Sequence, residues 1–288
     1  MQITGCSSGL GEALALQFHA TQKYTVYATA RRLESIDHLA SQGIHTLSLD
    51  VTSEASIKTA IDSILTNNGA ITVLINNAGY SSIGPVVEQP VQQIENVLNT
   101  NVLGVVRVSQ AVVPRMVEGG IRGLIINIGS VVSQMTTPFS AAYSASKAAL
   151  LAVTDALRLE VEPFGIGVSY VTAGAIKSAF ADNAATQTDL SIYERPSSLY
   201  HHWVDIIRAR IQMSQTMGSE RAEEVAVKIE RVVGRALAQQ PRPRPPVWFF
   251  VGGNARVVWF WGLLQKLFGW PTNGMLAKRF KLQYTASA

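Results

Sequence analysis

A glycine-rich turn lies near the start of the chain and limits which folds the chain can adopt. Residues Thr4–Gly11 read TGCSSGLG, and apolar residues at helical spacing follow them. Glycines at a strand-to-helix turn permit positive φ and let a phosphate approach backbone N–H groups. The phosphate then lies at the N-terminus of the following helix, where the partial positive charge of the helix attracts it. A second apolar run, Tyr24–Thr29, completes a strand–helix–strand unit. The turn therefore predicts an α/β fold that holds a dinucleotide.

The same alternation of strand and helix patterns continues along the chain. Further strands are predicted at Ile44–Leu49, Val73–Ile75, Gly123–Gly129 and Gly167–Val171, with helical patterns between them, the longest from Val91 to Val117. Regular alternation with right-handed crossovers predicts one doubly wound, Rossmann-type parallel sheet with helices on both faces. We expect residues 1–288 to form a single domain of this α/β class.

The end of the second strand bears on the choice of cofactor. An acidic residue there would bind the ribose 2′-hydroxyl of NAD, but this chain has Arg31 and Arg32. Arginine suits a 2′-phosphate through its charge and its fork of donors. The pair therefore predicts NADPH as the cofactor. The alternative is that both arginines only begin a solvated loop.

A tyrosine, a lysine and a serine form the candidate catalytic group. Tyr143 and Lys147 are four positions apart, so a helix places them on one face. An ammonium beside a phenol lowers the phenol pKa from about 10, which allows proton transfer near neutral pH. Ser130 ends the apolar run before them and can reach the same substrate oxygen. The alternative for Tyr143 and Lys147 is a solvated helix face.

Composition excludes several classes of function. Hydrophobic residues make up 47% and charged residues 15% of the 288, which is ordinary for a globular enzyme. The net charge of +4 comes from scattered basic residues, so we expect no nucleic-acid partner. Cys6 is the one cysteine, which excludes an internal disulfide and a cysteine-based metal site. The first ten residues are already motif, so we expect no signal peptide and a cytoplasmic location.

These motifs together resemble the short-chain dehydrogenase/reductase family over nearly the whole chain. The matching elements are Thr4–Gly11, Asn76–Gly79, Asn101, Ser130 and Tyr143–Lys147, in the family's order and spacing. Within the family, Tyr27–Glu34 and Lys278–Leu282 resemble fungal NADPH-dependent 1-acyldihydroxyacetone-phosphate reductases. The chain is also similar to hydroxysteroid and retinol dehydrogenases and to reductases of fungal secondary metabolism.

The resemblance implies a role for each matching residue. Tyr143 would be the general acid, while Lys147 would bind the nicotinamide ribose and lower the Tyr143 pKa. Ser130 would polarise the carbonyl, and Asn101 would hold a water in a proton relay. The implied cofactor contacts, besides Arg31, Arg32, Tyr143 and Lys147, are Gly5, Ser7, Ser8, Gly9, Leu10 and Gly11 at the pyrophosphate, Asp50 and Val51 at the adenine, Asn77, Ala78 and Gly79 at the centre, and Ile176 and Ser178 near the nicotinamide. A homodimer or homotetramer is also implied.

Two departures from the family pattern stand out. Ala173–Gly174 replaces the usual Pro-Gly after the sixth strand, which puts the stiffness of that loop in question. Met1–Thr4 leaves a very short first strand, and from this we expect a natural start upstream.

Two segments outside the motifs bear on the substrate. Residues 177–218, the lid segment, are long for a plain connection. Within them, Ser197–Met217 predicts one amphipathic helix with an apolar stripe. That stripe is interpreted either as core packing or as an apolar lid over the nicotinamide. His201 and His202 are expected at the surface.

Residues 247–270, the C-terminal segment, are rich in aromatic and apolar side chains. A last strand is predicted at Val247–Val251 and a helix at Arg256–Trp270. Charges at Arg256 and Lys266 exclude a membrane-spanning helix. The alternatives are burial in the fold or an oligomer, or peripheral contact with an endoplasmic-reticulum or lipid-droplet membrane.

The sequence as a whole predicts NADPH-dependent reduction of a ketone on a hydrophobic substrate. Acyl-dihydroxyacetone phosphates and secondary-metabolite ketones are the candidate substrates. One alternative is NADP+-linked oxidation of a steroid- or retinol-like hydroxyl. A second, of another class, is a non-catalytic nucleotide-binding scaffold.

Overall fold

Seven parallel strands form the centre of the molecule, in the order β3-β2-β1-β4-β5-β6-β9. The computed structural model describes residues 1–216, 218–239, 241–268 and 272–282. Most of the strands are short apolar runs buried on both faces, as a parallel sheet requires. The strands are β1 Gln2–Thr4, β2 Tyr27–Ala30, β3 His45–Ser48, β4 Val73–Asn76, β5 Leu124–Ile128, β6 Gly167–Ala173 and β9 Trp248–Val251.

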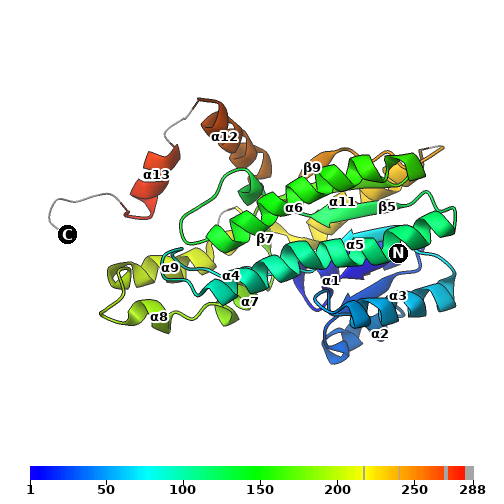
Figure 1. Cartoon of the computed structure of the whole chain (residues 1–288), viewed down its shortest axis with the longest axis horizontal. Coiled ribbons are helices and arrows are strands. Elements are labelled where there is room, and N and C mark those ends of the chain that lie inside the picture. Colours follow the sequence, from blue (N-terminus) through cyan, green and yellow to red (C-terminus); the bar gives the residue numbers. More distant parts are fainter. Residues whose placement is uncertain (217, 240, 269–271, 283–288) are drawn as a thin grey trace.

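Helices cover both faces of this sheet (Figure 1), which confirms the predicted doubly wound fold. One apolar core joins the sheet to α1 and α11, and a second joins its other face to α3, α5 and α6. The helices around the sheet are α1 Gly9–Ala20, α2 Asp37–Ala40, α3 Glu54–Asn68, α4 Val91–Leu98, α5 Gly104–Glu118, α6 Ala141–Glu160 and α11 Ala222–Leu237, with short 3-10 turns η1 Leu33–Ile36, η3 Val131–Ser133 and η4 Glu162–Phe164.

The first strand is short but central. Ile3 pairs with Ala28 of β2 on one side and with Ile75 of β4 on the other. All three residues of β1 are buried. The carboxyl end of β1 therefore delivers the glycine-rich turn directly to the middle of the sheet.

The helical pattern predicted from Val91 to Val117 is present, with a π-helical turn at its centre. This turn, η2 Asn99–Leu103, joins α4 to α5 without a break in the helix. A π turn inserts one extra residue and often marks a functional site. Here Asn101 is completely buried.

The lid segment is built from several short helices, so the single helix predicted for Ser197–Met217 is wrong. The carboxylate of Glu88 accepts hydrogen bonds from the Ser198 hydroxyl and, at 2.7 Å, from the Leu199 N–H. These bonds hold the chain in a loop there, and Met217 lies outside the described residues. The helices of the lid segment are α7 Phe180–Thr186, α8 Ser191–Glu194, η5 His201–Trp203, α9 Val204–Ile211 and α10 Met213–Thr216, and the short paired strands β7 Ile176–Lys177 and β8 Glu220–Arg221 flank it.

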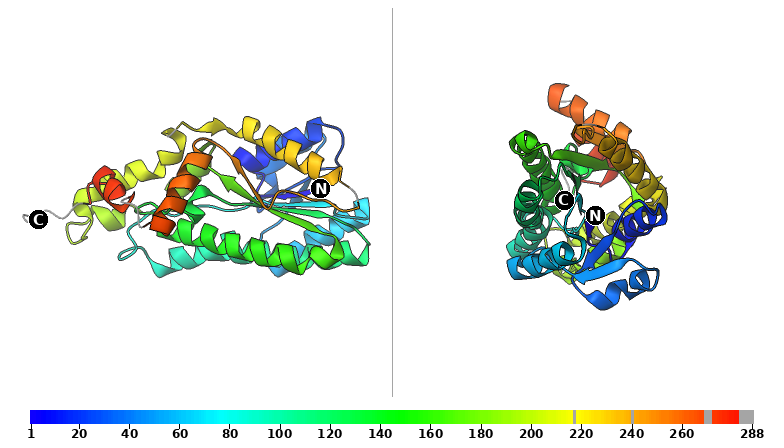
Figure 2. Two further views of the ribbon diagram at one scale, coloured as in Figure 1. Left: turned by 90° about the horizontal axis from the view of Figure 1, so that it is seen from above. Right: turned by 90° about the vertical axis from the view of Figure 1, so that its right-hand side faces the viewer.

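The apolar stripe of the lid segment packs as a separate small core. Ile207 and Ile211 are buried there against Phe139 and against Phe280, which directly follows α13 (Thr272–Arg279). Figures 1 and 2 show the lid helices and α13 gathered at one end of the molecule, beyond the sheet. Leu199 is exposed and takes no part in this core, and His201 and His202 are exposed as predicted.

The C-terminal segment contributes β9 at the sheet edge and then helix α12, Ala255–Phe268. The helix confirms the prediction for Arg256–Trp270 up to Phe268, since Gly269 and Trp270 lie outside the described residues. Gly262 lets α12 approach Gln134 and Met135 closely, because a Cβ there would lie 3.1 Å from both residues. Among the described residues, no helix combines the length and the apolarity needed to cross a bilayer.

Candidate active site

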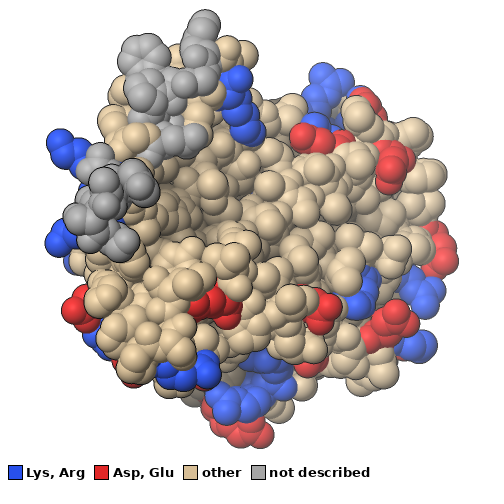
Figure 3. Space-filling model, turned by 60° about the vertical axis from the view of Figure 1, so that its left-hand side comes forward, with Lys and Arg blue, Asp and Glu red and all other residues tan. Residues whose placement is uncertain are grey.

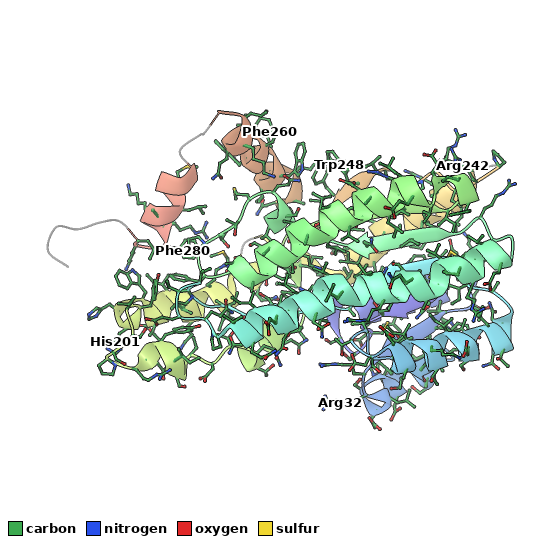
Figure 4. All side chains as sticks on the ribbon, viewed as in Figure 1. Arg32, His201, Arg242, Trp248, Phe260 and Phe280 are labelled. Atoms are coloured by element: carbon green, nitrogen blue, oxygen red, sulfur yellow. The ribbon has the colours of Figure 1, made fainter. Side chains whose placement is uncertain are left out.

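A cavity of about 1130 Å³ lies at the carboxyl ends of the strands. Arg32 and Phe280, labelled in Figure 4, line its two ends. Figure 3 shows a hollowed face of the molecule on which charged side chains lie mostly toward the edge. The predicted site residues that line the cavity are Gly5, Ser7, Ser8, Gly9, Leu10, Gly11, Arg31, Arg32, Asp50, Val51, Asn77, Ala78, Gly79, Ser130, Tyr143, Lys147, Ile176 and Ser178. The structure therefore brings together every predicted site residue except Asn101.

The glycine-rich turn is held in a fixed shape by close packing. Gly5 and Gly9 have φ of 72° and 63°, a conformation that favours glycine. A Cβ on Gly11 would lie 2.1 Å from the Gly5 carbonyl oxygen. The Asn77 amide donates to the carbonyl oxygens of Thr4 and Gly5 at 2.9 and 3.0 Å. The turn thus has the rigid backbone that a pyrophosphate cradle at the start of α1 requires.

The nucleotide end of the cavity carries two exposed arginines. Arg31 and Arg32 line it, and neither forms an ion pair within the described residues. Asp50, the acidic residue of this wall, accepts hydrogen bonds from the N–H and hydroxyl of Thr52 at 2.8 and 2.7 Å. The guanidinium groups are therefore available to a phosphate.

The serine, tyrosine and lysine meet at the centre of the cavity. Ser130 follows β5, while Tyr143 and Lys147 lie on α6. The Lys147 ammonium donates to the Ile128 carbonyl at 2.7 Å and lies 5.7 Å from the centre of the Tyr143 ring. A Cβ on Gly79 would lie 3.8 Å from this ammonium nitrogen. Lys147 therefore binds the end of β5 and lies near the Tyr143 ring and the loop after β4.

The protonation of this group differs from the prediction. Burial raises the pKa of the Tyr143 phenol, and the Ser130 hydroxyl offsets only part of that rise. Burial also lowers the pKa of Lys147 to about 8. The expectation of a lowered Tyr143 pKa is therefore wrong for the protein alone, because desolvation outweighs the opposing effects of the Ser130 hydroxyl and the Arg210 charge. The phenol is held protonated at neutral pH, which is the form that donates a proton.

Asn101 lies behind the cavity wall. Its amide nitrogen donates to the Tyr80 carbonyl and the Ser146 hydroxyl at 2.9 and 3.0 Å, and its oxygen accepts from the Tyr80 N–H at 3.0 Å. The Ser146 hydroxyl in turn donates to the Tyr143 carbonyl at 2.7 Å. Asn101 thereby connects the π turn to the helix that carries Tyr143. Its role in a water relay stays a prediction.

Two residues of the site were missed at the sequence level. The hydroxyl of Tyr170, on β6, accepts from the Ser130 N–H and donates to the Lys147 carbonyl, both at 3.1 Å. Arg210, on α9, lines the cavity and its charge acts on Tyr143. A signal existed for each residue. Tyr170 is a polar side chain within a buried strand, and Arg210 stands among Ile206, Ile207 and Ile211 at helical spacing.

The loop after β6 gains its stiffness from its neighbours, in the absence of the usual proline. The Gly174 N–H donates to the Val251 carbonyl at 2.8 Å, and the Ala175 N–H to the Gly253 carbonyl at 3.0 Å. A Cβ on Gly174 would lie 2.2 Å from the Gly253 oxygen. The C-terminal segment thus supports the loop that leads to Ile176 and Ser178.

Comparison with known proteins identifies the family of the chain. The family model for short chain dehydrogenases matches residues 1–189. The NADPH-dependent 1-acyldihydroxyacetone phosphate reductase of Schizosaccharomyces pombe is 38% identical over 208 residues, 71% of this chain and 69% of that protein. A short-chain dehydrogenase of Penicillium crustosum is 38% identical over 243 residues, 83% of this chain and 84% of that protein.

Solved structures lead to the same family. A short-chain dehydrogenase from Streptomyces avermitilis superposes with a TM-score of 0.74 at 28% identity, covering 96% of each chain. The fold, the order of the motifs and these matches agree. The chain belongs to the short-chain dehydrogenase/reductase family and is an oxidoreductase.

Proposed function

We propose that this enzyme uses NADPH to reduce a ketone on a hydrophobic substrate to the secondary alcohol. The observation that carries the proposal is the cavity itself. One end presents two unpaired arginines, and the centre presents a protonated phenol beside a serine and a buried lysine. The relative from Schizosaccharomyces pombe, whose name states NADPH dependence, supports the choice of cofactor.

Each group of residues has a separate role in cofactor binding or in the reduction. The glycine turn would hold the pyrophosphate of NADPH, Arg31 and Arg32 its 2′-phosphate, and Lys147 its nicotinamide ribose. When bound, NADPH supplies the hydride that reaches the carbonyl carbon. Ser130 donates a hydrogen bond to the substrate oxygen, and Tyr143 donates the proton that turns this oxygen into a hydroxyl. Tyr170 is a positioning residue, because it fixes Ser130 and Lys147 through their backbone.

The wall around the reacting centre favours an apolar substrate. Ile83, Phe180, Ile211 and Met213 line this part of the cavity, and Leu276 and Phe280 close its far end. Acyl-dihydroxyacetone phosphates and secondary-metabolite ketones both meet this condition. Oxidation of a steroid- or retinol-like hydroxyl is the reverse chemistry at the same residues. The raised pKa of Tyr143 supports reduction, because oxidation needs the phenolate form.

A substrate screen tests the proposal. Consumption of NADPH is followed at 340 nm against acyl-dihydroxyacetone phosphates, steroid ketones and polyketide ketones, with NADH and with the alcohol plus NADP+ as parallel assays. We expect turnover of at least one ketone, with NADPH preferred over NADH. Binding of NADPH without turnover of any ketone in the panel would contradict the proposal.

We also propose that the C-terminal segment makes a peripheral contact with an anionic membrane from the cytoplasmic side. From Arg231 onward the chain carries nine basic residues and no acidic residue. Val257, Phe260 and Leu267 form an exposed apolar face on α12, and Figure 4 labels Phe260 at the edge of the molecule. An apolar helical face with basic neighbours is typical of helices that lie in the membrane interface.

Vesicle flotation tests this contact. We expect the full chain to float with vesicles that contain phosphatidylserine, and the double variant Phe260→Glu/Leu267→Glu to remain in solution. Vesicles of phosphatidylcholine alone serve as the control for charge. Equal flotation of both proteins would contradict the contact.

A further inference from the structure

The substrate end of the cavity is basic although its wall is otherwise largely apolar. Five basic side chains and one acidic side chain line the whole cavity. Arg31, Arg32 and Asp50 belong to the nucleotide end, and Lys147 serves the reacting centre. Arg210 of α9 and Arg279 of α13 remain, on two helices that pack together through the lid core. Neither has a part in the reduction of a neutral ketone.

Arg210 is half-buried and lacks the carboxylate that usually accompanies a guanidinium withdrawn from water. Its Nε and Nη2 donate to the Thr137 hydroxyl oxygen at 3.1 and 2.9 Å, which uses two of its five N–H donors. The described residues include every Asp and Glu of the chain, and none pairs with Arg210 or Arg279. An uncompensated charge taken from water is costly, so a site of this kind fits an anion.

The two arginines are close enough to act on each other and on the catalytic tyrosine. Burial, with a smaller contribution from the charge of Arg279, lowers the pKa of Arg210 to about 10. The positive charge of Arg210 in turn lowers the pKa of Tyr143, against the larger effect of burial. An anionic group held by Arg210 would therefore lie near the carbonyl that Tyr143 protonates.

We propose that Arg210, assisted by Arg279, binds an anionic group of the substrate, so that the enzyme takes ketones that carry a phosphate or carboxylate close to the carbonyl and an apolar chain beyond it. This inference rests on the proposed function for the position of the ketone. Planar guanidinium groups match the oxygens of both anions. The competing role for Arg210 is a purely structural one, in which its bond to Thr137 fixes α9 to the loop before α6.

Binding of three probes to the NADP+-loaded enzyme tests the proposal without turnover. Octyl phosphate, octanoate and 1-octanol share an apolar chain and differ in their head group, and the bound NADP+ occupies the nucleotide end. We expect one or both anions to bind at least 10-fold more tightly than octanol, and the stronger of the two identifies the anion. Affinity for that anion should fall as ionic strength rises, while octanol affinity stays constant.

Variants then assign the effect to Arg210. We expect Arg210→Gln to weaken binding of the preferred anion by about 10- to 100-fold, because charge-assisted hydrogen bonds of typical strength are lost. The affinity of this variant for octanol should stay within about 3-fold of that of the unmodified enzyme. Arg210→Lys should retain part of the affinity. Arg208→Gln is the matched control, since Arg208 lies exposed on the same helix and pairs with Asp205 and Glu194. It should leave all three affinities unchanged.

The outcomes separate this inference from the proposed function. An equal affinity of the unmodified enzyme for octanol and both anions would overturn the inference, whether or not Arg210→Gln folds. Equal losses for octanol and the anions in a folded Arg210→Gln protein would also overturn it in favour of the structural role. Tight anion binding without reduction of any ketone would retain the anion site and reject the reductase proposal.

Discussion

At the residue scale, the site depends on how burial sets protonation. Tyr143 and Lys147 are both displaced toward their neutral forms, because each is enclosed by protein. The sequence motif predicts the pairing of these two residues correctly. It does not predict which of desolvation and charge attraction is larger, because that depends on the depth of the cavity. Depth is a property of the assembled fold.

The lowered pKa of Lys147 makes stability depend on pH. The ordinary lysine value of 10.5 falls to about 8 in the folded protein, so the unfolded chain binds the proton more tightly between these values. Stability from this group therefore rises as pH increases from about 8 to 10.5, by up to about 3 kcal/mol. We expect denaturant unfolding at pH 7.5 and pH 10 to show this rise, and Lys147→Met to lack it. The same pH dependence in both proteins would contradict the assignment.

Gly129 gives a second prediction at this scale. A Cβ there would lie 1.9 Å from the buried ring of Tyr170, which fixes Ser130 and Lys147. We expect Gly129→Ala to lower the free energy of unfolding by about 3 kcal/mol or more, because the close-packed ring cannot move aside. Gly274→Ala, where a Cβ meets no atom within 4 Å, is the control. A Gly129→Ala protein as stable as the control would show that the ring is free to shift.

At the element scale, the regular strands and helices are predictable and the lid segment is not. The strands are apolar runs whose type depends on local pattern, so their predicted positions hold to within a few residues. The lid segment also carries a helical pattern at Ser197–Met217. Its first part is held in a loop by Glu88, more than a hundred positions earlier in the chain, and no local pattern contains that bond.

The bonds from Glu88 give a prediction for the lid segment. We expect Glu88→Ala to speed chymotryptic cleavage after Leu199 and Tyr200 by about 5- to 30-fold, because two charge-assisted hydrogen bonds to the loop at Ser198 and Leu199 are lost. Glu95→Ala, on the exposed face of α4, is the control. Unchanged cleavage in the Glu88 variant would mean that apolar packing alone holds the segment.

At the scale of the whole molecule, the cavity is assembled from the entire length of the chain. The glycine turn, the ends of β4 to β6, the lid segment and α13 all line it. The sequence motifs identify the nucleotide end and the reacting centre, because those residues follow strands in a known order. No sequence motif identifies Arg210 or Arg279 as cavity residues, because no motif shows that α9 and α13 pack together.

Cofactor binding across this assembly should stabilise the molecule. At 100 times its Kd, NADPH adds about 2.7 kcal/mol, which corresponds to about 5 °C in Tm for a protein of this size. We expect thermal unfolding to show this shift, and NADH at the same concentration to give a much smaller one. The double variant Arg31→Ala/Arg32→Ala should remove the difference between the two cofactors. A persistent preference for NADPH in that variant would place the 2′-phosphate elsewhere.

Turnover of the variant Tyr143→Phe, measured beside its affinity for NADPH, tests the central claim most directly. If Tyr143 donates the proton, the loss of its hydroxyl lowers kcat by about 100- to 10,000-fold. The Kd for NADPH should stay within about 3-fold, because the ring and Lys147 remain. Turnover close to that of the unmodified enzyme, with NADPH bound normally, would contradict the claim that this phenol is the proton donor.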